Sequence, residues 1–170
     1  GNGSCIEVGT DASPWGLGGW ISSAGIITHQ VACPITEEDA QIFGIPRGTC
    51  DGQQLWECLA VLVALRLWRE SFQDKRVTLR VRGNNVGSRD PLLKMRPGSP
   101  PLAIIARELA LLLVDAAFPP EVVHTPGVAH KAADHLSRVY SSSSEVNASI
   151  SHPALRNSIR TEVPARPRTW

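Results

Sequence analysis

The chain has 170 residues, of which 42% are hydrophobic and 19% are charged, and its formal net charge at pH 7 is +1. This length and apolar content suffice for one domain with a core. The near-neutral charge excludes a globally basic nucleic-acid binder, and no apolar stretch is long enough to cross a membrane. Four cysteines without a C-x-x-C pair or a zinc-type spacing indicate a reduced, intracellular protein, cytoplasmic or nuclear.

The first fifty residues predict a β-meander. Residues 5–10 alternate enough for a strand that ends at Asp11, and residues 17–21 and 26–31 predict two further strands joined by a hairpin turn. Residues 33–50 contain two prolines and two glycines, and we expect a loop with short local structure there.

The next element is an apolar helix over residues 53–65, in which Glu57 is the one charged residue. A helix that is apolar on all sides is buried, and a buried carboxylate without a partner is costly. Glu57 must therefore meet a cation, a donor cluster or a metal, unless it lies at a solvent-facing rim or pairs with an arginine. Asp51 is expected to cap the helix, with Gln54 in the capping-box position.

The second half of the chain predicts crossover-linked elements. Val77, Leu79 and Val81 alternate with polar residues, which predicts a strand over residues 76–82 with these three side chains inward, and Asn84 lies just past its end. The elements expected after it are a short helix at 85–95, an amphipathic helix at 102–117, a strand at 121–124 and a helix at 129–139 that carries Asp134.

This order of elements predicts an α/β fold. A mixed five-stranded sheet, with three antiparallel strands followed by two crossover-linked strands, would be flanked by helices. Residues 1–139 would form one domain, which we expect to be monomeric. From Tyr140 the composition shifts to Ser, Pro and Arg, so we expect residues 140–170 to be a disordered or loosely docked tail. The one methionine is Met95, which leads us to expect a segment of a longer polypeptide.

Acidic or amide residues stand at strand ends and inside apolar helices, in two specific patterns. The opening pattern is T-D-A-S-x-x-G-x-G-G, beginning at Thr10, and the closing pattern is P-G-x6-D-x-L-S-R, beginning at Pro126. Together with Glu57 and the stretch V-R-G-N-N around Asn84, they resemble the ribonuclease H domain that accompanies reverse transcriptase in retroelement polyproteins. The resemblance covers roughly residues 5–139.

The resemblance implies a metal-dependent endonuclease that hydrolyses the RNA strand of RNA–DNA hybrids. Two Mg²⁺ ions, for which Mn²⁺ can substitute, would neutralise charge on the attacking and leaving oxygens, and carboxylates are suitable ligands for them. Asp11 would bridge the two metals. Glu57 would hold one of them and contact the ribose side through water, and Asp134 would hold the other. These side chains are expected to converge with Asn84. The implied partners are the hybrid and a neighbouring reverse transcriptase domain of the same polyprotein.

Asn84 departs from the family pattern, in which the third ligand is an aspartate. An amide oxygen can touch a metal but brings no negative charge, so activity is expected to be weakened. The alternative is a catalytically degenerate fold that binds hybrids or acts as a scaffold. A transposase or integrase of the same superfamily is disfavoured by Glu57, and a P-loop nucleotide binder by the absence of G-K-[ST].

Three further residues have open roles. His124 lies ten residues before Asp134, a spacing that resembles that of the proton-shuttling histidine of the family, but it can equally finish the last strand. His130 is a second candidate for the shuttle. Arg138 in the closing pattern is expected to be a helix C-terminal charge rather than a catalytic group.

The glycines at 16, 18 and 19 suit either a tight hairpin or close backbone approach to the hybrid. Basic residues gather in one segment, which we call the basic band and regard as a candidate phosphate-facing surface, although a solvated surface would have the same composition. Its members are Arg66, Arg69, Lys75, Arg76, Arg80, Arg82, Arg89, Lys94 and Arg96.

Overall fold

A six-stranded mixed sheet forms the centre of the protein, in the order β5-β4-β1-β2-β3-β6. The computed structural model describes residues 5–82, 100–114, 116–117, 119–126, 130–141 and 152–164. β1, β2 and β3 are antiparallel, β4 is parallel to β1, β5 is parallel to β4, and β6 is parallel to β3. The strands are β1 (Cys5–Ala12), β2 (Gly16–Ser23), β3 (Ile26–Pro34), β4 (Arg76–Arg82), β5 (Glu121–Thr125) and β6 (Ile159–Arg160).

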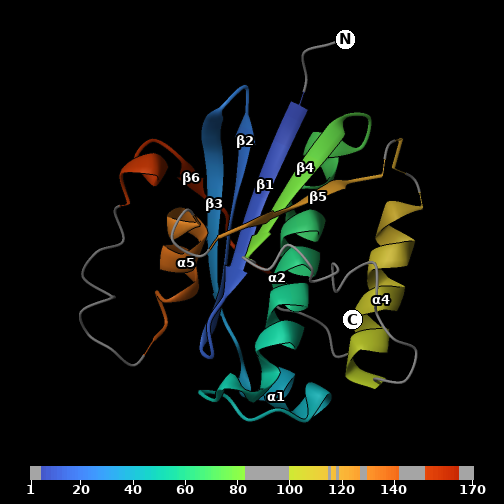
Figure 1. Cartoon of the computed structure of the whole chain (residues 1–170), viewed down its shortest axis with the longest axis vertical. Coiled ribbons are helices and arrows are strands. Elements are labelled where there is room, and N and C mark those ends of the chain that lie inside the picture. Colours follow the sequence, from blue (N-terminus) through green and yellow to red (C-terminus); the bar gives the residue numbers. More distant parts are fainter. Residues whose placement is uncertain are drawn as a thin grey trace.

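Helices cover both faces of this sheet (Figure 1). Along β3, Val31 and Cys33 pack with α2 and α4 in one apolar cluster, whereas Ala32 between them packs with α5 in another. Because successive side chains of a strand point to opposite faces, α2 and α4 lie on one face and α5 on the other. The helical elements are α1 (Glu37–Phe43), the 3₁₀ turn η1 (Cys50–Gly52), α2 (Gln53–Leu67), α3 (Arg69–Phe72), α4 (Pro100–Leu113), α5 (Lys131–Ser137) and the 3₁₀ turn η2 (Pro153–Leu155).

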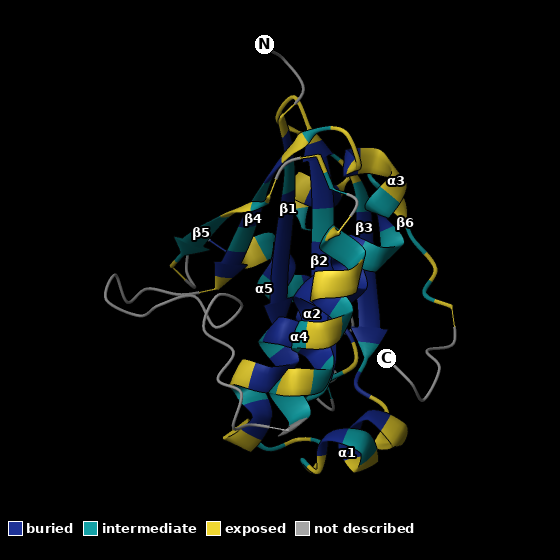
Figure 2. Cartoon of the chain, turned by 90° about the vertical axis from the view of Figure 1, so that its right-hand side faces the viewer, coloured by how far each residue is buried: buried dark blue, intermediate teal, exposed yellow. Residues whose placement is uncertain are grey.

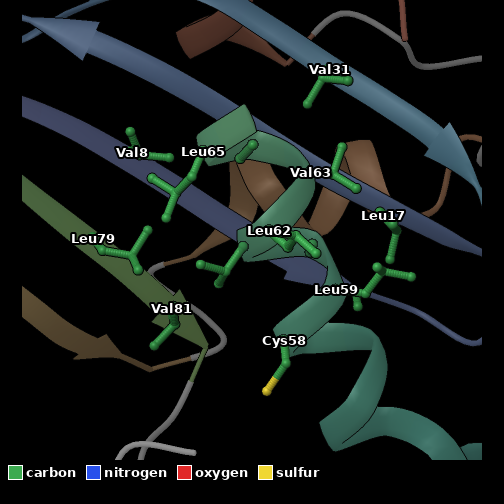
Figure 3. Packing of buried hydrophobic residues seen from close by; sticks show 14 of the residues in the cluster. Val8, Leu17, Val31, Cys58, Leu59, Leu62, Val63, Leu65, Leu79 and Val81 are labelled. Carbon is green, nitrogen blue, oxygen red and sulfur yellow. The ribbon is translucent and has the colours of Figure 1, made fainter. Parts of the chain in front are cut away.

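The larger apolar cluster forms around α2. Its side chains meet the inward residues of β1 to β4, as the close view in Figure 3 shows. Leu59 and Leu62 are fully buried, so the expectation of a helix enclosed on nearly all sides is confirmed. α4 packs against α2 through Ile105 and Leu109, and its outer side remains exposed (Figure 2). None of the helices in the described parts of the chain combines the length and apolarity that a membrane crossing requires.

The predicted mixed sheet flanked by helices is confirmed, including its three antiparallel strands and the two that follow. The inward side chains predicted for β4 are buried. Residues 33–50 contain more structure than expected, because Thr36 and Asp39 form a reciprocal capping box that starts α1. The helix expected at 85–95 lies outside the described residues.

The expected cap of α2 is wrong. Asp51 lies in η1, and the residue before α2 is Gly52, with no side chain capping the helix. A Cβ on Gly52 would lie 2.6 Å from the Ile45 side chain and 2.9 Å from Nε1 of Trp56. This close packing explains why the residue before α2 is a glycine rather than one with a capping side chain.

Part of the expected tail, residues 152–164, is more ordered than its composition suggests. Residues 152–164 dock on the sheet, Leu155 is 2% exposed, and β6 adds a sixth strand to the five that were expected. The side-chain amide of Gln30 donates to Ser158 Oγ over 2.8 Å, and Trp68 Nε1 donates to Thr161 Oγ1 over 3.1 Å. One buried leucine and a few polar contacts produce no periodicity, so the docking of this part of the tail could not be seen in the sequence. The boundary at residue 139 stays a prediction.

Leu155 tests how firmly the tail is docked. Leu155→Ala is expected to lower the free energy of unfolding by about 2–5 kcal/mol, because it leaves a cavity in the cluster that contains Ala32, Leu136 and Val139. Urea denaturation measures the change, with the exposed neighbour Arg156→Ala as the control. Equal stabilities of the two variants would contradict the docking.

Candidate active site

The carboxyl ends of β1, β4 and β5 lie at one edge of the sheet. Thr10 in β1 pairs with Val81 in β4, which pairs in turn with His124 in β5. Asp11 and Arg82 follow the first two of these residues in the chain. In parallel sheets, functional side chains gather at this edge because the strand ends meet there.

Asp11 is a buried carboxylate with one oxygen unsatisfied. Asp11 is 2% exposed to solvent. Oδ1 accepts a hydrogen bond from the Ala12 backbone N–H over 2.9 Å, and the buried Oδ2 has no hydrogen-bond partner in the described structure. Burial raises the pKa of Asp11 from its ordinary value of 3.8 to about 7, a shift that the Ala12 N–H and the Arg82 charge oppose. The charges of Asp134 and Glu57 raise this pKa further, so both carboxylates lie close enough to act on Asp11.

Glu57 reaches the same edge from α2 and is half-buried. The Gln53 side-chain amide donates to Glu57 Oε1 over 3.1 Å and to the Ala12 carbonyl over 2.7 Å. Gln53 thereby links the helix to the end of β1. Burial raises the pKa of Glu57, while the Gln53 hydrogen bond and the charges of Arg82 and His124 lower it. Glu57 thus has the partners expected of an enclosed carboxylate, a hydrogen-bond donor and nearby positive charge.

Asp134 approaches from α5, on the other face of the sheet. It forms an ion pair with Arg138, whose Nε lies 3.0 Å from Asp134 Oδ1. Arg138 is the C-cap residue of α5 and thus the helix C-terminal charge that was expected, and its partner is a candidate site carboxylate. Since α2 and α5 lie on opposite faces, Glu57 and Asp134 come together only around the end of β1.

The glycines of β2 explain how α5 lies so close to the sheet. A Cβ on Gly18 would lie 2.4 Å from the Ser137 backbone nitrogen and 2.6 Å from the Ala133 carbonyl oxygen. A Cβ on Gly16 would lie 2.6 Å from the Ser137 carbonyl oxygen. The close backbone approach that these glycines permit is therefore to α5, which carries Asp134, and their approach to a hybrid stays a prediction.

The two histidines have different surroundings. His124 lies within β5, so it does form part of the last strand, and both of its ring nitrogens are buried without a hydrogen-bond partner in the described structure. His130 is 4% exposed, and its Nε2 is hydrogen-bonded to the Thr10 carbonyl oxygen. Burial lowers the pKa of His130. An enclosed ring whose Nε2 is already bonded is poorly suited to carrying protons to a substrate.

The structure therefore brings part of the expected set of site residues together at this edge of the sheet. Glu57 and Asp134 each act electrostatically on Asp11, whereas Asn84 lies outside the described residues. Among the residues that are described, no group of three or more His, Cys, Asp or Glu side chains is arranged to hold a metal ion. The donor chemistry nonetheless fits a divalent cation, because Asp11 presents a buried carboxylate oxygen without a donor and two carboxylates have pKa values raised by burial.

Sequence reasoning did not single out Gln53 or assign Arg82 to the site. Gln53 stands four residues before Glu57, a spacing at which side chains on a helix meet, and this signal was available. Arg82 was counted in the basic band, and its place beside Asp11 depends on the pairing of β1 with β4. Only the sheet register identifies it.

Other members of the basic band are engaged within the protein. Arg66 forms an ion pair with Glu108 of α4 over 2.7 Å. Arg80 donates two hydrogen bonds to Glu7 of β1. These two arginines tie elements of the fold together, so the band is not one continuous phosphate-facing surface.

Solved structures with the same fold are ribonucleases H1. RNase H1 from the halophilic archaeon Halobacterium salinarum NRC-1 superimposes with a TM-score of 0.55 at 16% sequence identity, over 82% of this chain and 97% of that chain. LC11-RNase H1, isolated from compost by a metagenomic approach, gives a TM-score of 0.51 at 17% identity, over 80% of this chain and 93% of that chain. Neither a protein-family model nor a curated protein matches the sequence. The chain thus has a ribonuclease H-like fold.

Burial of Asp11 predicts a stability that depends on pH. A carboxyl with a pKa of about 7 in the folded protein and 3.8 in the unfolded chain favours the folded state when protonated, so this contribution is lost as pH rises from about 4 to 7. Asn cannot ionise. Without divalent cations, Asp11→Asn is expected to be more stable than the parent above pH 7, by at most about 4 kcal/mol, and to vary less with pH.

Thermal denaturation between pH 4 and pH 8 in the presence of a chelator measures this difference. The exposed Asp74→Asn is the control, because it removes the same charge from the surface. An Asp11→Asn variant that is less stable than the parent at pH 8 would show that the carboxylate is not strained by its burial.

Proposed function

We propose that the chain is a metal-dependent endonuclease that hydrolyses the RNA strand of RNA–DNA hybrids. The observation that carries this proposal is the buried Asp11, with an oxygen that lacks a donor, on a ribonuclease H-like fold and within electrostatic reach of Glu57 and Asp134. A site that holds carboxylates at such a cost in stability is typical of sites built for function.

The cofactor in this proposal is a pair of Mg²⁺ ions, replaceable by Mn²⁺. Asp11, Glu57, Asp134 and the amide of Asn84 would hold them. Bound divalent ions stabilise the attacking and leaving oxygens of a phosphodiester. Gln53 orients the Glu57 carboxylate through its hydrogen bond, and Arg82 adds a fixed positive charge beside Asp11 and Glu57. His124 is the candidate proton carrier, because no described group occupies its ring nitrogens.

Asn84 favours a second candidate function. An amide in place of the third carboxylate weakens the attraction for divalent cations, so the domain could bind hybrids without cleaving them. The proposed biological setting is a retroelement polyprotein with a neighbouring reverse transcriptase domain, within the cell. That setting rests on the two sequence patterns around Asp11 and Asp134.

Reversion of Asn84 separates the two functions. The parent chain is expected to cleave hybrid weakly or undetectably, and Asn84→Asp is expected to gain cleavage. One restored anionic ligand corresponds to about 3–4 kcal/mol of transition-state stabilisation, or roughly a few hundred- to a thousandfold in rate. The measurement is cleavage of labelled RNA–DNA hybrid with Mg²⁺ or Mn²⁺.

Asp11→Asn added to the revertant should abolish cleavage again, whereas Asp74→Asn should leave it unchanged. Hybrid binding without cleavage by the revertant would favour the binding module. Robust cleavage by the parent would show that Asn84 does not weaken the site.

The basic band tests how the hybrid is held. Neutralising Arg89, Lys94 and Arg96 together should weaken hybrid binding and reduce its dependence on salt, because each phosphate contact releases counterions. Fluorescence anisotropy across a range of salt concentrations measures both quantities. Neutralising Arg47, Arg156 and Arg160 removes the same charge elsewhere. Equal effects of the two triple variants would mean that the band acts only through net charge.

A further inference from the structure

A buried imidazole joins the two elements that carry Asp11 and Asp134. His130 is the residue immediately before α5, and its backbone carbonyl accepts the first hydrogen bond of that helix, from Asp134 N–H over 3.0 Å. Its ring crosses to β1, where Nε2 meets the Thr10 carbonyl oxygen. This contact thus lies one residue from Asp11 and one helical turn from Asp134.

The chemistry of this contact defines which nitrogen of the His130 ring carries the proton. A carbonyl oxygen only accepts hydrogen bonds, so Nε2 of His130 must carry the proton. Burial lowers the pKa of His130, which favours the neutral ring with its single proton on Nε2. The donor is therefore retained without placing a buried charge beside the carboxylates.

Other contacts of α5 with the sheet are made at its last turn or by backbone packing on β2, where Gly18 is the partner of Asp11 in the sheet. Ser13 Oγ donates to the Ser137 carbonyl over 2.7 Å, at the opposite end of the helix. Gly16 and Gly18 permit close approach of the helix backbone but supply no directional bond. Among the contacts described here, the His130 hydrogen bond is the directional one that ties the first turn of α5 to β1, one residue before Asp11.

We propose that His130 is a positioning residue: its Nε2–H donates to the Thr10 carbonyl and holds the first turn of α5, and with it Asp134, in place relative to Asp11. The proposal rests on the function proposed above, since it assigns these carboxylates to one cation-binding site. It replaces proton transfer as the role of His130. Residues that orient metal ligands commonly affect metal affinity without touching the metal.

The test compares His130→Phe, which keeps an aromatic ring without a donor, with His130→Gln, which keeps a donor. Ser13→Ala is the matched control, because it removes the hydrogen bond at the other end of α5. Mn²⁺ titration by calorimetry should show a loss of roughly tenfold or more in affinity for His130→Phe, substantial recovery in His130→Gln, and a change within about twofold for Ser13→Ala. Equal losses in His130→Phe and Ser13→Ala would mean that only general stability matters, and would overturn the proposal.

A second experiment, amide hydrogen exchange in the metal-free protein, tests the role of His130 without any cation. In His130→Phe the Asp134 amide should exchange faster while the Arg138 amide, bonded to the His135 carbonyl, keeps its protection. If the parent binds no Mn²⁺, the proposed function fails, and this exchange pattern still decides the role of His130. Unchanged exchange at Asp134 would overturn it.

The parent protein supplies a check that does not depend on a variant folding. Nitrogen NMR of the His130 ring should show the proton on Nε2, protected from solvent exchange. A ring protonated on Nδ1 alone would overturn the proposal, because Nε2 could then not donate to Thr10.

Discussion

The burial of the Asp11 carboxylate is the constraint on which the rest of the site depends. β1 is central in the sheet, and its end is enclosed by α2 from one face and by α5 from the other. A carboxylate in such a place loses hydration and regains one backbone hydrogen bond, so its pKa rises to about 7. In the proposed site, a bound cation would offset this cost.

The two helices reach the end of β1 by different means. α2 is held by apolar packing on nearly all sides, and Gln53 connects it to the Ala12 carbonyl. α5 is short, and it approaches through the space left by Gly16 and Gly18, with polar links from Ser13 and His130. The position of Glu57 thus depends mainly on the core, whereas that of Asp134 depends on the close approach at the glycines and on the His130 hydrogen bond at the same helical turn. Substitutions near α5 are expected to affect the site more than the fold.

Arg82 brings positive charge to this edge of the sheet. Arg82 lowers the pKa values of both Asp11 and Glu57, which partly offsets the cost of burial. The same positive charge would weaken the binding of a divalent cation close to it. With Asn84 as a further ligand, as proposed, the site would be less negative than one with four carboxylates. Cation affinity is for this reason the most informative property to measure.

The layered fold and the candidate carboxylates could be predicted from local patterns in the chain. Period-two alternation predicted β4 with its inward valines and leucine, and the apolar stretch around Glu57 predicted an enclosed helix. These signals are local, because each depends on residues near one another in the chain. Asp51 shows the limit of such local signals. It matched the pattern of a capping residue, but the residue before α2 is Gly52, which packs closely against Ile45 and Trp56. Contacts between distant segments could not be predicted in this way: Arg82 beside Asp11, His130 on Thr10, α5 against the glycines, and Leu155 with β6 on the sheet. Register and helix packing bring these residues together, and neither leaves a periodic trace in the sequence.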